Sequence, residues 1–522
     1  MSSFNQMPTP SLDPDSIDSI ETTDTIVAIS TPPGRGGIGI VRLAGPEALN
    51  IAAQLLRLTT PLDHAHARFT HILDPASPTK NIDDAIVTAF LRPHSYTGDD
   101  LVEIAAHGSP VVLEAIVLRA LTLGARLATP GEFTQRAFLS GRLDLTQAEA
   151  VHDLIAAQTL DQARVAAQQL GGAISRRVAP AKGSLLHLIA LLEAGMDFAS
   201  GELDDVDIVP PAQIAREIAE VRAPLAQLAA SFRRGQLLRS GASLALVGRP
   251  NAGKSSLFNR LLDRDRAIVT PVPGTTRDTV EESLALGGIP IRLIDTAGLR
   301  LEDDQHIDEA EQQGIARSHE ALADADLVLL IVDVTHPPET LNLSTTLASR
   351  RYLLVHNKID LLPTQTPVIS TLSTPSTAVI STGGEAPTSV ISTLSIPSTA
   401  VISTEVERPL YSSFARPGTT PIPTSALTGQ GIDTLRAAIL QALQAEGALA
   451  DAGALNNLRQ QQAVTATLTA LDAAHSANAA GLPHELILLD LHTALRALDS
   501  LTGATTPDDI LSLIFSTFCI GK

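Results

Sequence analysis

Eight residues, 248–255, carry the clearest chemical signal in this chain, because they form the pattern G-x-x-x-x-G-K-S. An apolar run at 244–247 precedes them and predicts a buried strand, and residues 256–262 predict an amphipathic helix. A phosphate-binding loop requires this strand–turn–helix context, since backbone amides and the helix N-terminus then face the anion. Lys254 would reach the β- and γ-phosphates and Ser255 would ligate magnesium. A chance glycine turn is the alternative.

Two downstream segments indicate which base such a site takes. Residues 357–360 read Asn-Lys-Ile-Asp and follow an apolar run at 352–355. The carboxylate of Asp360 accepts two hydrogen bonds from the guanine edge, whereas adenine lacks the exocyclic donor and would leave that carboxylate unpaired. Residues 424–427, Thr-Ser-Ala-Leu, fit a second loop that reads guanine.

A third segment, 295–298, reads Asp-Thr-Ala-Gly and ends a strand predicted at 291–294. Asp295 would hold magnesium through water, and the amide of Gly298 would sense the γ-phosphate. Patterns as short as N-K-x-D or D-x-x-G are weak alone. Their order and spacing behind a phosphate loop nevertheless predict a GTP-binding domain.

The residues that would hydrolyse GTP are less obvious from spacing. In the Ras-like arrangement a glutamine follows the D-x-x-G glycine and orients the attacking water, but this chain has Leu299 there. Glu311 is a candidate general base, although spacing alone favours an exposed helical carboxylate. No arginine finger is evident, and Asn251 beside the phosphates would help to bind a monovalent cation.

Composition limits the classes of partner and compartment. The 522 residues suffice for about three domains, and 44% of them are hydrophobic. A net charge of −20 means that any RNA contact must use local basic patches, for which 176–177 and 233–234 with Arg239 are candidates, although such pairs are usually solvated surface. The single cysteine, Cys519, excludes an internal disulfide. No apolar run approaches the roughly 18 residues that span a bilayer, so we expect a cytoplasmic protein without a membrane segment.

The N-terminal part predicts an α/β domain. Strands are expected at 25–29, 38–43, 84–91 and 101–106, and a helix at 110–123 opened by a proline. Gly34, Gly36 and Gly39 satisfy G-x-G-x-x-G, but a strand rather than a helix follows, so we reject a dinucleotide site. The pair His107-Gly108 ends a predicted strand. A turn is at least as good an interpretation of this pair as a ligand site.

In the rest of the chain, segments with helical spacing lie before and after the GTP-binding segment. Helical spacing occurs at 146–169, 174–198, 211–232, 455–475 and 483–501. Neither helical block makes a complete bundle alone, so the simplest architecture is one discontinuous helical domain with a P-loop, Ras-like GTPase domain inserted. The predicted boundaries are 1–24 for a disordered tail, 25–143 for the α/β domain, 144–239 and 448–522 for the helical domain, and 240–447 for the GTPase domain. A duplicated Ser/Thr/Pro segment at about 364–420 predicts a disordered insertion.

Taken together, these motifs resemble one family, the tRNA-modification GTPases called MnmE or TrmE. The resemblance covers nearly the whole chain after the tail, and the nested domain order with the segments 274–278 and 518–522 is its most specific part. The other segments that carry it are 31–37, 96–100, 130–134 and 143–150. The family pattern implies a homodimer joined through the N-terminal domain, which would bind a 5,10-methylene- or 5-formyl-tetrahydrofolate.

The resemblance also implies the site residues. Folate would contact Arg42, Glu103, Arg142 and Lys522; Arg142 stands where the family often has lysine, and the two cations differ in geometry. The alternative for Arg42 and Glu103 is that they are ordinary charged residues on the surface of a strand. The nucleotide would contact Asn251, Ala252, Gly253, Lys254, Ser255, Ser256, Thr270, Pro271, Val272, Pro273, Gly274, Thr275, Thr276, Asp295, Thr296, Ala297, Gly298, Asn357, Lys358, Asp360, Ser425, Ala426 and Leu427.

The same pattern implies two metal ions and a catalytic group. Magnesium would bind Ser255 and Thr276, and potassium would take the place of an arginine finger. The potassium ligands would be Asn251, Thr270, Val272 and Thr275, and Glu311 would be the catalytic glutamate. The stretch between Gly298 and Glu311 is longer than usual for the family, and the repeat insertion is also unusual, so both bear on how the GTPase works.

The implied reaction installs an aminomethyl-type group on carbon 5 of the wobble uridine of certain tRNAs. The partner would be the flavoprotein MnmG (GidA), in a heterotetramer, with folate supplying the one-carbon unit. Cys519 would be either catalytic or merely positioned at the terminus. Two other interpretations stay open: a GTP-dependent ribosome or RNP assembly switch without one-carbon chemistry, and a GTPase disabled by its insertion.

Overall fold

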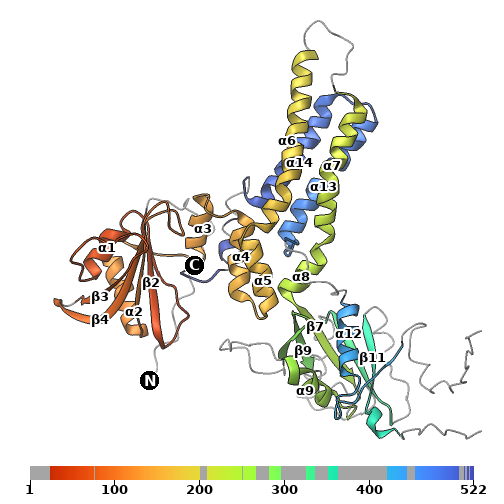
Figure 1. The fold of residues 1–522 in the computed structure, drawn as a ribbon, viewed down its shortest axis with the longest axis horizontal. Coiled ribbons are helices and arrows are strands. Elements are labelled where there is room, and N and C mark those ends of the chain that lie inside the picture. Colours follow the sequence, from red (N-terminus) through yellow and green to blue (C-terminus); the bar gives the residue numbers. More distant parts are fainter. Residues whose placement is uncertain are drawn as a thin grey trace, which may run out of the picture. The chain divides into compact units, whose positions relative to one another are not determined.

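The computed structural model describes residues 24–75, 77–199, 209–249, 251–265, 281–295, 325–335, 351–362, 420–443, 453–504, 511, 514–516 and 518–521. The chain forms two compact units, which we describe separately (Figure 1). The first comprises residues 1–241, 288–290 and 447–522, and the second comprises 242–287 and 291–446. The predicted tail at 1–23 and the predicted insertion at 364–419 lie outside the described residues.

The first unit opens with a six-stranded sheet in the order β3-β4-β5-β2-β1-β6. All neighbours are antiparallel except β1 and β6, which are parallel. The strands are β1 (Ile26–Ile29), β2 (Gly36–Ala44), β3 (Ala67–Asp74), β4 (Ser77–Phe90), β5 (Leu101–Gly108) and β6 (Arg126–Leu127). A strand at β2 confirms that the glycine-rich stretch before it does not open a helix.

One face of this sheet packs against helices α1 (Ala48–Leu55) and α2 (Pro110–Thr122). Burial alternates along β2 and β5, so residues two apart share a face. Val41, Leu43 and Ile104 therefore point into the core with the helices. The intervening positions, which include Arg42 and Glu103, lie on the opposite face. Alternation thus separates the core from the polar residues predicted to bind a ligand.

The first unit also contains a four-helix bundle, with neighbouring pairs α6–α7, α7–α13, α13–α14 and α14–α6 (Figure 1). Its apolar core draws residues from both sides of the second unit in sequence, from Ile174 to Leu501. Arg459 also joins the two sides, because it binds Glu149 through two hydrogen bonds of 2.7 and 2.9 Å. The helices of this region are α3 (Glu132–Leu139), α4 (Leu145–Ala156), α5 (Leu160–Leu170), α6 (Ala173–Ala199), α7 (Pro211–Ala230), α8 (Phe232–Ser240), α13 (Leu458–Ala479) and α14 (His484–Thr502).

Helix boundaries differ from the prediction in one place that has a clear cause. The stretch 146–169 is two helices rather than one, because Asp144 and Thr159 each begin a helix with a capping box. In each box the side chain of the first residue accepts a hydrogen bond from the backbone amide three residues later. The side chain of the glutamine at that later position accepts a hydrogen bond from the backbone amide of the first residue. Helical spacing continues across the break, so periodicity alone does not reveal it.

The second unit is built on a sheet in the order β12-β11-β10-β7-β9-β8, in which the pairs from β12 to β9 are parallel. Strand β7 is buried along its whole length, as a central strand covered on both faces should be. The elements are β7 (Ala242–Gly248), α9 (Lys254–Asp265), β8 (Glu281–Leu286), β9 (Ile289–Asp295), β10 (Leu327–Asp333), β11 (Tyr352–Asn357), η1 (Ile359–Leu361), β12 (Ile422–Pro423) and α12 (Ile432–Ala442). The two sheets and the bundle confirm the predicted mixture of α/β and all-α parts.

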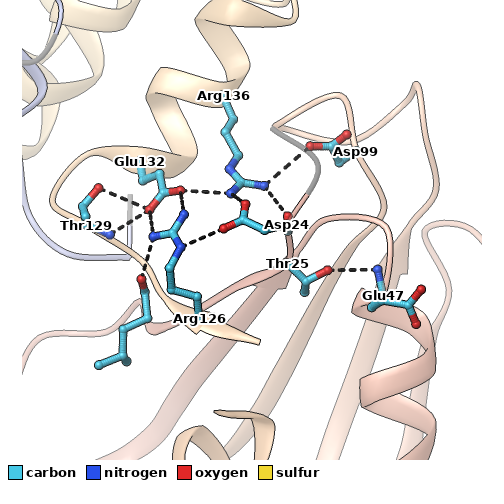
Figure 2. Close-up of polar contacts among 9 residues, drawn as sticks. Asp24, Thr25, Glu47, Asp99, Arg126, Thr129, Glu132 and Arg136 are labelled. Atoms are coloured by element: carbon cyan, nitrogen blue, oxygen red, sulfur yellow. Dashed lines mark hydrogen bonds and ion pairs between the residues drawn. The ribbon is translucent and has the colours of Figure 1, made fainter. Parts of the chain in front are cut away.

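A buried charge cluster fixes α3 to the first sheet (Figure 2). Glu132 is fully buried, and its carboxylate accepts hydrogen bonds from Arg126 at 2.7 and 3.1 Å and from Arg136 at 2.9 Å. Arg136, only 1% exposed, also donates to Asp24 at 2.5 Å. Burial alone would raise the pKa of Glu132, but the bonds from Arg126, the Thr129 amide and Arg136 outweigh it and lower that pKa. The carboxylate is therefore ionised at neutral pH.

We expect the substitution Glu132→Ala to lower the free energy of unfolding of the first unit by about 3–5 kcal/mol, because it leaves the buried guanidinium of Arg136 and the half-exposed guanidinium of Arg126 without their shared anion. Urea denaturation of the full chain measures this. Arg164→Ala is the matched control, since its ion pair with Asp161 is exposed and contributes at most about 1 kcal/mol. Equal midpoints for the two variants would contradict a stabilising role for the cluster.

Candidate functional site

The phosphate-loop residues have the backbone geometry that close approach to an anion requires. Asn251 and Gly253 adopt positive φ angles of 64° and 88° before α9 begins at Lys254. A Cβ atom on Gly248 would lie 2.3 Å from the carbonyl oxygen of Ile331, and one on Gly253 would lie 2.3 Å from Nδ2 of Asn357. Glycine is therefore needed at both ends of the loop for packing as well as for conformation.

The polar side chains of this loop cluster at the start of α9. The Nζ of Lys254 donates to the carbonyl oxygens of Gly248 at 2.9 Å and Arg249 at 3.1 Å, so the ammonium group lies over the loop. Ser255 and Ser256 are exposed on the first turn of the same helix. A helix N-terminus flanked by an ammonium group and hydroxyl groups suits a phosphate chain, and a hydroxyl at Ser255 suits a hard cation.

Asn357 joins two of the predicted sequence segments. Its side chain is buried, its Nδ2 donates to the carbonyl oxygen of Ala252 at 3.0 Å, and its Oδ1 accepts from the amide of Ala426 at 3.1 Å. One amide group thus connects the phosphate loop to the loop at 425–427. The structure therefore brings the predicted phosphate-binding and guanine-reading residues to one place.

Lys358 is held by a residue that the sequence reasoning missed. Its φ angle is 67°, and its Nζ lies 2.7 Å from Oδ2 of Asp333, at the end of β10. Thr335 donates to the other carboxylate oxygen from its amide at 2.9 Å and its hydroxyl at 2.6 Å. Partial burial alone would raise the pKa of Asp333, but these hydrogen bonds and the charge of Lys358 lower it to about 2. No motif marks Asp333, because its role depends on the pairing of β10 with β11.

The loop at 425–427 is fixed from a second direction by Arg260. The Nε of Arg260 donates to the carbonyl oxygen of Ala426 at 2.8 Å, and its Nη2 donates to that of Leu427. Arg260 lies on α9, so the helix that follows the phosphate loop also positions the second guanine-reading loop. Asp360 and Leu427 are exposed beside these contacts. No sequence pattern distinguishes Arg260 from an ordinary charged residue on a helix.

Several predicted residues lie outside the described residues, and their placement stays a prediction. They are Thr270, Pro271, Val272, Pro273, Gly274, Thr275, Thr276, Thr296, Ala297, Gly298, Glu311 and Lys522. Asp295 ends β9, and only its backbone is described.

A second set of predicted residues meets on the face of the first sheet that lies opposite α1 and α2. Arg42 and Glu103 are direct cross-strand neighbours, with Nε and Nη2 of the arginine 3.0 and 2.5 Å from Oε1 of the glutamate. The guanidinium lies 5.9 Å from the ring centre of Tyr96 and 5.6 Å from that of Phe133, which is cation–π range. Arg142 is exposed, and within the described ranges no hydrogen bond or ion pair joins its side chain to this pair.

The C-terminal segment reaches the same face. The carbonyl oxygen of Gly521 accepts from Ser30 Oγ at 3.0 Å and lies 3.5 Å from Nη1 of Arg42. A Cβ atom on Gly521 would lie 2.5 Å from the carbonyl oxygen of Ile29, so this contact requires glycine. Lys522 follows directly, and Cys519 is exposed two residues before Gly521. The family resemblance, rather than the spacing of the residues, is what predicts that Arg42 and the C-terminus share one site.

None of the helices in the described part of the chain combines the length and apolar composition that crossing a membrane requires. Within the same ranges, no group of three or more His, Cys, Asp or Glu side chains is arranged to hold a metal ion. The predicted ligands for magnesium and potassium fall only partly in these ranges.

Comparison with known proteins covers both units. Residues 25–142 match the family model described as the GTP-binding protein TrmE N-terminus, and residues 145–519 match the model described as the MnmE helical domain. A protein of Koribacter versatilis named tRNA modification GTPase MnmE is 51% identical over 505 residues, which cover 96% of this chain and 99% of that protein. Proteins of the same name from Nitrosomonas europaea and Roseiflexus castenholzii are 41% and 38% identical, each over 96% of this chain and over 100% and 99% of their own lengths.

We expect Asp333→Asn to lower the free energy of unfolding of the second unit by about 1 kcal/mol at pH 7, because it removes one charged partner of a mostly buried ion pair. The pKa of Asp333 is lower in the folded protein than its usual 3.8, so its stabilisation is present above that pH and is lost as the pH falls towards 2.

Urea denaturation at several pH values measures this difference between wild type and variant. It should stay constant from pH 7 to pH 5 and shrink below pH 4. Asp433→Asn, which alters a highly exposed partner of Arg436, should change stability by less than about 0.5 kcal/mol. A difference that shrinks already above pH 5 would show that Asp333 is not the group responsible.

Proposed function

The chain belongs to the MnmE (TrmE) family of tRNA-modification GTPases, and on this premise we propose that it hydrolyses GTP to drive the modification of tRNA. The observation that carries the proposal is the buried amide of Asn357, which connects the phosphate loop to the loop at 425–427. A nucleotide bound across both loops would have its phosphates at the start of α9 and its base between Lys358 and Leu427.

The nucleotide would be GTP before hydrolysis and GDP afterwards. Asp360 is exposed next to Lys358, whose ammonium group is already held by Asp333. The aliphatic part of Lys358 is thereby positioned to cover one face of the base, and Asp360 to accept hydrogen bonds from the guanine edge. The other predicted contacts at 251–256 and 425–427 surround the same region.

Magnesium and potassium are the metal ions that we propose for this site. Ser255 on the first turn of α9 would hold magnesium together with Thr276, and the left-handed Asn251 would hold potassium with Thr270, Val272 and Thr275. Cations there would balance the charge of the phosphates. The proposed general base is Glu311, and its proton acceptance from the attacking water is the step that this chain's own residues would perform.

The Arg42 site is the proposed contact for a tetrahydrofolate derivative. Its support is a guanidinium that lies 5.9 and 5.6 Å from the centres of two aromatic rings, is paired with Glu103 and is approached by the carbonyl oxygen of Gly521. Folate has flat rings and an anionic glutamate tail, so aromatic and cationic groups suit it. Arg142 is exposed where it would meet that tail, and Lys522 follows Gly521. The folate would supply a one-carbon unit when bound.

The wider assembly follows the family pattern as a proposal. Two copies would pair through their N-terminal parts, and the flavoprotein MnmG would join them in a heterotetramer in the cytoplasm. The product would carry an aminomethyl or carboxymethylaminomethyl group on carbon 5 of the wobble uridine. Cys519 is exposed near the Arg42 site, where its role would be either chemical or purely positional.

We expect a strain that lacks this protein to accumulate wobble uridines without the carbon-5 group. Mass spectrometry of nucleosides from purified tRNA measures this, and complementation with the intact gene should restore the modification. Complementation with Lys254→Ala should not restore it, because the ammonium group over the phosphate loop is lost. Unchanged modification in the deletion strain would instead favour an assembly role without one-carbon chemistry.

We expect GTP turnover by the purified protein to rise at least tenfold when potassium replaces sodium, and to fall by about 10²–10⁴-fold in Glu311→Ala, the usual contribution of a general base. Phosphate release measures both. Glu309→Ala is the matched control, because it removes a neighbouring carboxylate. Normal turnover in Glu311→Ala would refute the assignment of Glu311, and no turnover in the wild type would indicate a GTPase disabled by its insertion.

A further inference from the structure

The C-terminal segment, residues 518–521, begins at an apolar anchor. Phe518 and Phe515 are buried together with Leu145 and Ala148 of α4. The ring centres of the two phenylalanines lie 5.4 Å apart, a separation at which aromatic rings attract each other. The start of the segment is therefore held in place by packing.

Gly131 brings this anchor into contact with α3. It is the N-cap residue of α3 and has a φ angle of 70°. A Cβ atom on Gly131 would lie 2.9 Å from Cβ of Phe518, and the Gly131 amide donates to the carbonyl oxygen of Cys519 at 3.4 Å. Because α3 also carries Phe133, which lies beside Arg42, the first half of the segment is fixed relative to the proposed folate site.

The other end of the segment is held by fewer contacts. Cys519 and Ile520 are exposed, so they contribute little packing. The carbonyl oxygen of Gly521 accepts a hydrogen bond from Ser30 Oγ at 3.0 Å, whereas Nη1 of Arg42 lies 3.5 Å away, at the outer limit of such a bond. Of these two contacts, the one from the Ser30 hydroxyl is the better hydrogen bond.

The backbone of Ser30 is itself fixed to the first sheet. Ser30 follows β1, and its amide donates to the carbonyl oxygen of Ile40 on β2 at 2.8 Å. Arg42 lies two residues further along the same strand. A Cβ atom on Gly521 would lie 2.9 Å from Cα of Ser30, so the two backbones are in close contact. The hydroxyl of Ser30 thus connects the end of the segment to the sheet that carries Arg42.

The position of Gly521 matters for the guanidinium group of Arg42. Its Nε and Nη2 donate to Oε1 of Glu103, whereas its Nη1 faces the carbonyl oxygen of Gly521. Gly521 therefore forms one wall of the site at this group. Lys522, the next residue, is a proposed folate contact, and a binding group that is already in position loses less entropy when its ligand arrives.

We propose that Ser30 is a positioning residue of the proposed folate site and acts through the C-terminal segment. Its hydroxyl holds the carbonyl of Gly521 beside Arg42 and thereby places Lys522 for contact with the folate. Ser30 itself does not touch the ligand. The inference rests on the proposed binding of a tetrahydrofolate derivative and adds the group that arranges the site before the ligand binds.

The first experiment measures the segment without any ligand. Cys519 is the only cysteine of the chain and is exposed, so a trifluoroethyl group attached to it labels the segment alone. We expect the fluorine NMR line of the full chain to become at least twofold narrower in Ser30→Ala, because the end of the segment is released. Gly521→Ala gives the reference for a displaced segment, since its Cβ atom would lie 2.5 Å from the carbonyl oxygen of Ile29.

Ser77→Ala is the matched control, because it removes a hydroxyl that contacts Thr79, at the start of β4. Its fluorine line should be as broad as that of the wild type. Equal linewidths in the wild type and Ser30→Ala would overturn the proposal. So would a wild-type line already as narrow as that of Gly521→Ala, because the segment would then not be held.

The second experiment measures binding of 5-formyl-tetrahydrofolate to the unlabelled full chain by calorimetry. We expect Ser30→Ala to bind about fivefold more weakly than the wild type, the usual scale for the loss of one hydrogen bond, and Ser77→Ala to bind as the wild type does. Equal thermal denaturation midpoints for the three proteins would show that the change in affinity does not come from unfolding.

The outcomes separate this inference from the proposed function. Binding by the wild type with unchanged affinity in Ser30→Ala would refute the role of Ser30 alone. No binding by the wild type would refute the proposed folate site and, with it, the role of Ser30 in binding, whatever the fluorine spectra show.

Discussion

The second unit depends on the two hydrogen bonds of one buried amide, that of Asn357. Because this side chain binds the carbonyl of Ala252 and the amide of Ala426, the phosphate loop and the second guanine-reading loop share a support. The parallel pairing of β11 with β10 and of β10 with β7 sets the distance between them. Without a side chain that both donates and accepts at this position, the two loops would be connected only indirectly, through Arg260 on α9.

The first unit relies on ionised groups that are removed from water and matched with one another. Glu132 with Arg126 and Arg136 fixes α3, and α3 in turn carries Phe133 beneath the guanidinium of Arg42. The pair of Glu149 and Arg459 performs a similar role between α4 and α13. Any other packing of α3 or α4 would leave these charges unsatisfied, so we expect them to favour the observed arrangement. The proposed ligand sites lie next to the parts that are fixed most firmly.

Much of this could be predicted from the sequence, because the information was local. The strand–loop–helix around Lys254, the strands at β9 and β11 and the proline that opens α2 follow from periodicity and capping. The interruption between α4 and α5 was missed because the capping box at Thr159 begins a new helix without changing the apolar spacing. Asp333 and Arg260 were missed for another reason: each depends on contacts between segments 25 and 166 residues apart. The residues of the proposed hydrolytic step, Glu311 above all, remain a prediction from sequence pattern.

The apolar core of the helical bundle has a consequence for how the protein is made. Its members come from α6 and α7 on one side of the second unit and from α13 and α14 on the other. On the ribosome, α6 and α7 therefore emerge long before the partners that bury their apolar faces, and the whole nucleotide-binding unit is synthesised in between. Domains fold as units during translation, so the second unit is able to fold before the bundle is complete. During that time Ile214, Ile218 and Leu225 remain exposed and accessible to chaperones. Translation speed through residues 242–446 would then set how long that exposure lasts.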